Sequence, residues 1–331
     1  MLAKFKTAFA VLRETWLLAR VPPNDTIFHE LRLLADETTD NPKGLHRYLE
    51  DYPSLGRIVV EKDWCYDNSS DEMRLNYSNS LFADGCLRIK PGKKDSAVIV
   101  FLPGNTTAAD DVFRPGNHRH NMTRVAETLG MGLACWDWPL QGGRRDRCLY
   151  QGLRSLYSGE REYSRILPAL GTCLWREKVS ELQFALAQIG RFIGRQSEIH
   201  VVGWSMGGCF AYLAPLLATG VRTTIAVGSC AAVKDLLAEG KTRVHGYFFY
   251  PLNGLTYFDL EDIVGEALKS YHSLKIIYGE HDAGCLERTS RTLVDEAVRL
   301  NRPLEITVLP DHGHVFSPIV KNRIMECLIA A

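Results

Sequence analysis

Short, mainly apolar runs recur through most of the chain, and helical periodicity fills the stretches between them. The first run is Ala97–Leu102, and the others are Gly132–Trp136, Ile199–Val202, Thr224–Val227, Leu274–Tyr278 and Leu304–Leu309. A strand that is apolar at every position is buried on both faces, which is typical of a parallel sheet. Alternation of such strands with helices predicts an α/β fold with a mostly parallel, doubly wound sheet.

The segments around these runs complete the predicted sheet and its helical layers. Strands are predicted over Arg57–Lys62 and Leu81–Ile89, and helices over Trp175–Ile193, Leu286–Leu300 and Ser317–Ile329. The first of these helices carries an apolar stripe made of Val179, Leu182, Leu186, Ile189 and Ile193. Because right-handed crossovers place the carboxyl ends of parallel strands at one edge, a ligand site is expected at that edge.

Two regions differ from the repeating pattern. Residues 1–55 form a predicted N-terminal helical extension, and residues 56–331 form the α/β domain. The extension begins with an apolar helix face (Leu2, Phe5, Phe9, Leu12 and Trp16) that is expected to pack on the rest of the chain, with docking to a partner or a membrane surface as the alternative. Residues 140–173 and 229–272 are longer than a β-α repeat needs and are predicted to form lids or pocket walls.

Composition excludes several classes of protein. The chain has 39 Lys and Arg against 39 Asp and Glu, so it lacks the basic excess of a nucleic-acid binder. No apolar stretch reaches the roughly 18–20 residues of a membrane span. The nine cysteines form no CxxC pair, and Met1–Leu12 does not read as a signal peptide, so a cytoplasmic location is expected.

The most informative motif is Gly203-Trp204-Ser205-Met206-Gly207-Gly208. It follows the apolar run Ile199–Val202 and precedes a helical segment, Cys209–Leu217. A G-x-S-x-G between strand and helix predicts a nucleophile elbow, a sharp turn that exposes the hydroxyl of Ser205. Small residues on both sides leave room for that turn.

A serine hydroxyl needs a base, and the base needs an acid that orients it. Asp282 follows the run Leu274–Tyr278 and is the predicted acid, with Glu280 and Asp235 as alternatives. His314 follows the last run and is the predicted base, because Gly313 would allow a tight loop there. His312 is the alternative, expected to be a supporting or solvent-facing residue.

Two further features lie near the predicted site. Acyl transfer generates an oxyanion that needs two donors, and the backbone N–H groups of Met206 and Asn105 are predicted to supply them. The second belongs to the loop Pro103-Gly104-Asn105 after the first apolar run. A cluster of arginines (Arg144, Arg145, Arg147 and Arg154) is expected to form structural ion pairs or a solvated face, with binding of an anionic substrate as the alternative.

These motifs, in this order, resemble those of the α/β-hydrolase superfamily from about Arg57 to the C-terminus. The matching segments are the oxyanion loop Phe101–Asn105, the elbow Gly203–Gly208, the acid loop Gly279–Asp282 and the histidine loop Gly313-His314. More narrowly, the chain is similar to acetyl xylan esterase-like and dienelactone hydrolase-like members in the segments Trp136–Arg144, Ile166–Gly171, Tyr250–Leu252 and Tyr257–Asp262. It departs from them in having Pro103 where many members have His, and Ser205 where a true dienelactone hydrolase has Cys.

The expected activity is that of a serine esterase. Ser205, His314 and Asp282 would cleave a small-molecule carboxylic ester through an acyl-enzyme, without metal or organic cofactor. An acyltransferase, a thioesterase or a peptidase would use the same triad, and a non-catalytic ligand-binding protein could have the same fold.

Overall fold

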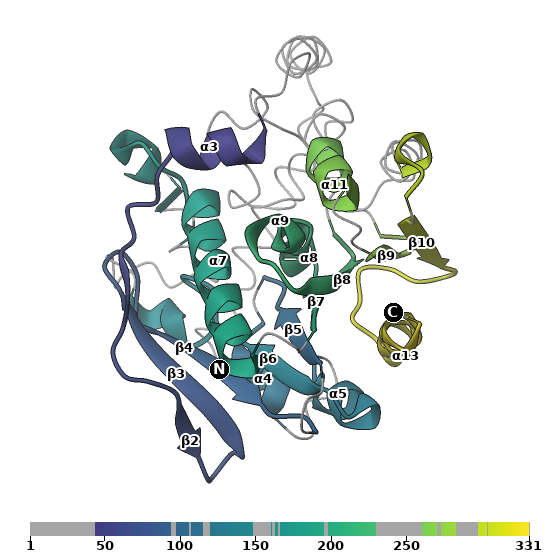
Figure 1. Ribbon diagram of the computed structural model, residues 1–331, viewed down its shortest axis with the longest axis horizontal. Coiled ribbons are helices and arrows are strands. Elements are labelled where there is room, and N and C mark those ends of the chain that lie inside the picture. The colour runs from purple at the N-terminus through teal and green to yellow at the C-terminus, as the bar shows by residue number, and fades with distance from the viewer. Residues whose placement is uncertain are drawn as a thin grey trace, which may run out of the picture.

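A ten-stranded sheet runs through the part of the chain that the computed structural model describes. The described residues are 44–93, 97–105, 107–114, 120–147, 160, 163–164, 166–194, 198–229, 260–269, 273–282, 297–302 and 304–330. The strand order is β1-β3-β4-β6-β5-β7-β8-β9-β10, and β2 pairs with β3 outside this path (Figure 1). The mostly parallel, open sheet expected from the apolar runs is confirmed.

The six apolar runs form the parallel part of the sheet. They are β5 (Val98–Leu102), β6 (Gly132–Cys135), β7 (Ile199–Trp204), β8 (Val221–Val227), β9 (Ser273–Gly279) and β10 (Leu304–Leu309). Every neighbouring pair among them is parallel. β5 and β7 are buried at all positions, as expected for strands covered on both faces.

The antiparallel edge was only partly predicted. It comprises β1 (Ile58–Val60), β2 (Cys65–Asp67), β3 (Glu72–Asn79) and β4 (Gly85–Lys90). The strand predicted over Leu81–Ile89 begins only at Gly85, because the side chain of Asn79 accepts hydrogen bonds from the N–H groups of Leu81 and Phe82 and holds a turn there. β2 and β3 are additional strands that the sequence pattern did not predict.

Helices cover both faces of the sheet (Figure 1). One hydrophobic cluster joins the sheet to α3 (Leu45–Asp51), α7 (Leu174–Ile193), α8 (Met206–Ala211), α9 (Ala214–Leu217) and α11 (Leu260–Lys269). A second cluster on the other face includes α4 (Ala109–Phe113), α5 (Thr123–Leu129) and α13 (Pro318–Ile329). Short 3₁₀ turns are η1 (Gly142–Arg147) and η2 (Leu167–Leu170).

Helix α7 joins the N-terminal part of the described chain to the sheet. Its predicted apolar stripe is confirmed at Val179, Leu182, Leu186 and Ile189, which are all buried, while Ile193 is half-buried. Buried Glu177 accepts hydrogen bonds from the N–H groups of residues 55 and 56 and from the hydroxyls of residues 54 and 172. Residues 44–56 are therefore tied to α7, while residues 1–43, including the predicted apolar helix face, lie outside the described residues.

The other predicted helices have mixed outcomes. α13 matches its prediction, and Ser317 caps it by accepting from the N–H of Val320. The segment Cys209–Leu217 is not one helix but two, because Pro215 has no N–H to continue the first. Of the helix predicted over Leu286–Leu300, residues 297–300 are helical and the rest lie outside the described residues.

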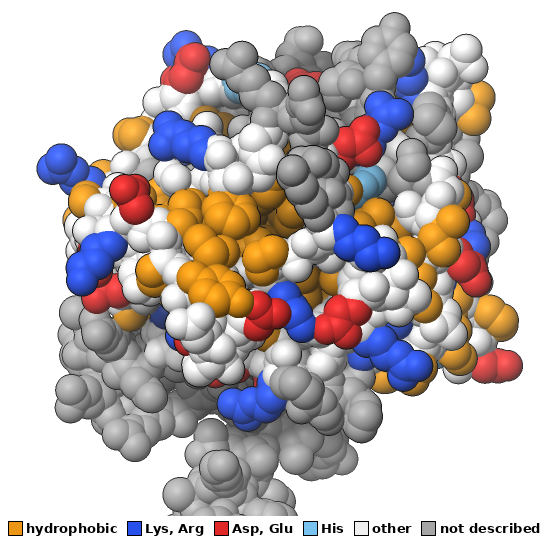
Figure 2. Space-filling model, turned by 60° about the horizontal axis from the view of Figure 1, so that its bottom comes forward, with side chains coloured by type: hydrophobic (Ala, Val, Ile, Leu, Met, Phe, Trp, Pro, Cys, Tyr) orange, Lys and Arg blue, Asp and Glu red, His pale blue; other side chains and the backbone are white. Residues whose placement is uncertain are grey.

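The surface carries charges of both signs. Figure 2 shows hydrophobic side chains gathered on one face, with Lys, Arg, Asp and Glu interspersed around them. Positive and negative side chains are therefore mixed on this face. Among the described helices, none combines the length and the apolar character that crossing a membrane requires.

Candidate active site

Ser205 occupies a strained turn between β7 and α8. Its φ is 53° and its ψ is −117°, a conformation that a residue with a side chain rarely adopts. The N–H of Ser205 donates to the carbonyl of Val227 on the neighbouring strand β8 at 2.8 Å. This bond fixes the turn to the sheet and leaves the hydroxyl at the carboxyl-terminal edge.

The glycines of the motif are required by close backbone contacts. A Cβ on Gly203 would lie 2.3 Å from the carbonyl oxygen of Gly207, and a Cβ on Gly207 would lie 1.9 Å from that of Leu102. The start of α8 thus packs against both the turn and the end of β5. This packing brings the loop after β5 next to Ser205.

His314 contacts Ser205 across the edge of the sheet. Its Nε2 lies 2.9 Å from the Ser205 hydroxyl oxygen. The imidazole stacks on the ring of Trp204, with ring centroids 4.6 Å apart and an interplanar angle of 28°. The ring is thereby held between Trp204 and the hydroxyl, and the side chain remains 43% exposed.

Asp282 completes the chain of contacts. Its Oδ2 lies 2.9 Å from His314 Nδ1, and its side chain is fully buried. With a proton on Nδ1, the imidazole donates to this carboxylate, and Nε2 is free to accept the Ser205 proton. The structure therefore brings together the three residues predicted as nucleophile, base and acid.

The alternative residues have other contacts. His312 Nε2 lies 3.1 Å from the carbonyl of Val315 and 3.0 Å from the hydroxyl of Ser317. It therefore holds the start of α13 in place. Glu280 accepts from the backbone N–H of Asp311, and Asp235 lies outside the described residues.

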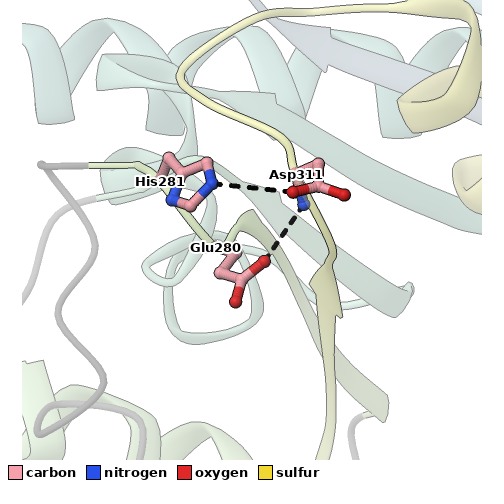
Figure 3. A group of neighbouring side chains, drawn as sticks. All are labelled: Glu280, His281 and Asp311. Carbon is pink, nitrogen blue, oxygen red and sulfur yellow. Dashed lines mark hydrogen bonds and ion pairs between the residues drawn. The ribbon is translucent and has the colours of Figure 1, made fainter.

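Glu280, His281 and Asp311 form an exposed group where β9 and β10 end (Figure 3). Their possible ligand atoms all lie within 4.8 Å of one another. His281 Nε2 is 3.9 Å from the Asp311 carboxylate, and the backbone N–H of His281 donates to the carbonyl of His312 at 2.8 Å. These contacts join the loop that carries Asp282 to the loop that carries His314.

The loop geometry at His314 has a different origin from the expected one. Gly313 has no positive φ, and the nearest atom to a Cβ placed on it would be 4.0 Å away. The crowded position is Gly279, where a Cβ would lie 2.1 Å from the carbonyl oxygen of His312. The close approach of the two loops thus depends on the glycine of the acid loop.

The predicted oxyanion donors lie on the two segments that Gly207 packs together. Met206 is the first residue of α8, so its N–H precedes the intrahelical hydrogen bonds. Asn105 follows Gly104, where a Cβ would lie 2.6 Å from Cδ1 of Trp204. The Asn105 side chain accepts a hydrogen bond from Gln141 Nε2 at 2.7 Å.

The segment after β6 is held by Asp137 and Arg144. Asp137 accepts from the N–H groups of Ala109 and Gly143, and burial raises the pKa of its carboxyl. Arg144 is buried, pairs with Glu181 and donates to the carbonyl of Ala83 at 2.8 Å. The expectation of structural ion pairs is thus met at Arg144.

Comparison with known proteins gives matches in structure only. No protein-family profile matches the chain, and no curated protein is similar to it in sequence. An acetyl xylan esterase from Paenibacillus sp. R4 is 15% identical, with a TM-score of 0.52 over 90% of this chain and 93% of that chain. An esterase from Pyrococcus furiosus is 15% identical, with a TM-score of 0.51 over 85% of this chain and 93% of that chain. A putative dienelactone hydrolase from Klebsiella pneumoniae is 13% identical, with a TM-score of 0.51 over 83% of this chain and 98% of that chain.

The chain has the α/β-hydrolase fold. The resemblance of its motifs to acetyl xylan esterase-like and dienelactone hydrolase-like proteins is therefore confirmed at the level of the fold. In this α/β-hydrolase fold, Ser205 lies at the turn after β7, Asp282 follows β9 and His314 follows β10.

Sequence reasoning missed two residues of the candidate site. Trp204 was noted only as a position in the elbow motif, yet its ring supports His314. Gly228 follows β8 with a φ of 52°, and a Cβ there would lie 3.1 Å from Asp282 Oδ2 and 3.2 Å from His314 Cε1. Its signal was a glycine directly after a buried strand.

Proposed function

We propose that this chain is a serine hydrolase that cleaves a carboxylic ester through an acyl-enzyme. The observation that carries the proposal is the continuous set of contacts from Ser205 Oγ to His314 Nε2 and from His314 Nδ1 to Asp282, each 2.9 Å long. A hydroxyl, an imidazole and a buried carboxylate in this order are the groups that activate a serine.

The first half of the reaction forms the acyl-enzyme. His314 takes the proton of Ser205 as the oxygen attacks the acyl carbonyl, and Asp282 stabilises the resulting imidazolium. The negative oxygen of the tetrahedral intermediate accepts hydrogen bonds from the N–H groups of Met206 and Asn105. Collapse of the intermediate breaks the bond to the alcohol, which takes the proton from His314.

The second half releases the acid. Water loses a proton to His314 and attacks the acyl carbon, and Ser205 recovers its proton when the second intermediate breaks down. All proton transfers pass through one imidazole. Its 43% exposed side chain gives water and the leaving alcohol access to that ring.

Two of the structural neighbours are named as esterases, one of them for acetyl esters of xylan. We take a small acetyl ester as the first substrate class to test on this chain. At 15% identity, the likeness to this neighbour supports the fold and not the substrate. The choice of an ester therefore depends on the geometry around Ser205 and on the chemistry that it allows.

The direct test is hydrolysis of p-nitrophenyl acetate by the full chain and by Ser205→Ala. Ser205 has a half-buried side chain, and its replacement removes only the hydroxyl. We expect turnover by the wild-type chain and loss of about 10³-fold or more in kcat in the variant. Equal turnover by the two proteins would contradict the proposal.

Product analysis separates the reactions that share this triad. An acyltransferase would form a new ester or amide when an alcohol or amine is added, whereas a hydrolase releases the free acid. Parallel assays with a thioester and a peptide amide test the thioesterase and peptidase alternatives.

A further inference from the structure

A buried polar group contacts both residues that we propose as oxyanion donors. It consists of Gln141, Glu160 and Lys178, which come from three separate segments and are nearly or wholly excluded from solvent. Glu160 Oε1 accepts a hydrogen bond from Gln141 Nε2 at 2.9 Å and another from Lys178 Nζ at 2.8 Å. One carboxylate oxygen thus joins the loop after β6 to helix α7.

Fold stability is a weak explanation for this arrangement. Removing two charges from water costs several kcal/mol each, and apolar residues of similar volume often stabilise a core as well or better. Burial lowers the pKa of Lys178, and the charge of Glu160 opposes that shift. Within the described part of the chain, the second oxygen of Glu160 and the carbonyl oxygen of Gln141 are buried without a hydrogen-bond partner. The group therefore carries a desolvation cost that its internal bonds do not fully offset.

The contacts of the group lead directly to the oxyanion donors. Gln141 Nε2 donates to Asn105 Oδ1 at 2.7 Å, and it lies 3.5 Å from the sulfur of Met206. Lys178 Nζ lies 3.3 Å from the same sulfur. The side chains of Asn105 and Met206 are thus both in contact with one buried network.

We propose that Gln141, Glu160 and Lys178 are positioning residues that fix the backbone N–H groups of Asn105 and Met206 for the oxyanion. Lys178 and Glu160 hold the amide of Gln141, and that amide holds the side chain of Asn105. This inference rests on the proposed function, because an oxyanion hole has a role only if Ser205 is acylated.

The effect should appear in the transition state. Oxyanion donors must lie about 2.7–3.1 Å from the developing charge, and a displacement of about 1 Å can cost on the order of 100-fold in rate. The ground-state carbonyl makes weaker contacts there, so loss of position should lower kcat and leave KM nearly unchanged. The contacts between Ser205, His314 and Asp282 do not include the network, so the pH dependence of kcat should keep its midpoint.

The experiment compares kcat and KM for p-nitrophenyl acetate in the wild-type chain, Gln141→Leu, Asn105→Ala and the double variant. Leu matches the volume of Gln but has no donor, and Ala at 105 keeps the backbone N–H. We expect each single variant to lose about 10- to 100-fold in kcat at a KM within about threefold of the wild type. Because both changes break the same hydrogen bond, we expect the double variant to lose no more kcat than the single variant with the larger loss.

Glu177→Gln is the matched control for damage to a buried charge. Glu177 is the neighbour of Lys178 on α7 and is equally buried, but its hydrogen bonds go to residues 54–56 and 172. We expect this variant to lower the melting temperature without the loss in kcat. Glu160→Gln keeps an acceptor for Gln141 but removes the charge that pairs with Lys178, so we expect a loss of kcat smaller than that of Asn105→Ala at a nearly unchanged KM. If the Leu variant does not fold, wild-type kcat in folded Glu160→Gln would overturn the positioning role.

The outcomes separate this inference from the proposed function. Wild-type kcat in folded Gln141→Leu, additive losses in the double variant, or an equal loss of kcat in Glu177→Gln would overturn the positioning role alone. Turnover by the wild-type chain that Ser205→Ala does not reduce would overturn both proposals.

Discussion

Replacing Asp282 with Asn removes a negative charge beside the imidazole and changes little else in size. The carboxylate of Asp282 lies 2.9 Å from His314 Nδ1, and its side chain has no exposed surface. An amide nitrogen in that place would favour the tautomer with the proton on Nε2, which cannot accept the proton of Ser205. The variant should therefore lose activity while keeping its fold.

The size of the loss follows from the geometry. At the observed N–O separation of 2.9 Å, a carboxylate and an imidazolium attract each other by about 6 kcal/mol for an effective dielectric constant of about 20. The imidazole is 43% exposed, and solvent screening lowers this attraction to about 4 kcal/mol. A barrier raised by about 4–6 kcal/mol corresponds to a loss of about 10³- to 10⁴-fold in kcat.

The assay is hydrolysis of p-nitrophenyl acetate at pH 7–8, with circular dichroism and thermal unfolding to verify the fold. Glu280→Gln is the control, because Glu280 lies on the same loop but is exposed and pairs with the backbone of Asp311. We expect this control to stay within about threefold of the wild-type kcat. A loss of less than about 10-fold in Asp282→Asn, or an equal loss in Glu280→Gln, would refute the assignment of the acid.

Three further changes test the surroundings of the site. Gly207→Ala places a Cβ 1.9 Å from the carbonyl oxygen of Leu102, so we expect a lower melting temperature by differential scanning fluorimetry and a loss of kcat, and unchanged values for both would contradict the packing. Trp204→Leu removes the ring that stacks on His314 and should lower kcat about 10-fold. Trp204→Phe keeps an aromatic face and should lose less kcat. A larger loss of kcat in the Phe variant than in the Leu variant would rule out a stacking role. Burial raises the pKa of Asp137 in the folded state, so the contribution of this carboxyl to stability should be greatest below its unfolded pKa of about 3.9 and should be lost as pH rises through the folded value. Asp137→Asn should lose this contribution to the slope in urea unfolding measured from pH 4 to 7, and a variant with the wild-type slope would exclude this carboxyl as its source.

The parallel half of the sheet could be predicted because its signals are local. Each of its strands contains a short, mainly apolar run, and the elbow lies between such a run and a helix. β3 escaped prediction because its apolar residues, Leu75 and Tyr77 among them, alternate with polar ones and form no continuous run. Such alternation is typical of a half-buried strand, and β3 pairs with β4 in this way.

At the candidate site, too, the features with a local sequence signal could be predicted and those that arise on folding could not. Ser205, Asp282 and His314 could be selected because each follows a predicted strand and the strands end at one edge. The need for glycine at 279 and 228 could not be predicted, because it arises from backbone and side chains brought close by folding. Buried charges such as Lys178 are also invisible to a pattern search, since a lysine on a helix is usually solvated.

Labelling with a fluorophosphonate probe, read by intact mass, tests the central claim most directly. Such probes react with a serine whose hydroxyl is activated by a neighbouring base. We predict a single adduct on the wild-type chain and none on Ser205→Ala, with slow labelling of His314→Ala. An adduct that persists in Ser205→Ala, or a folded wild-type chain that stays unlabelled, would contradict an active serine at this site.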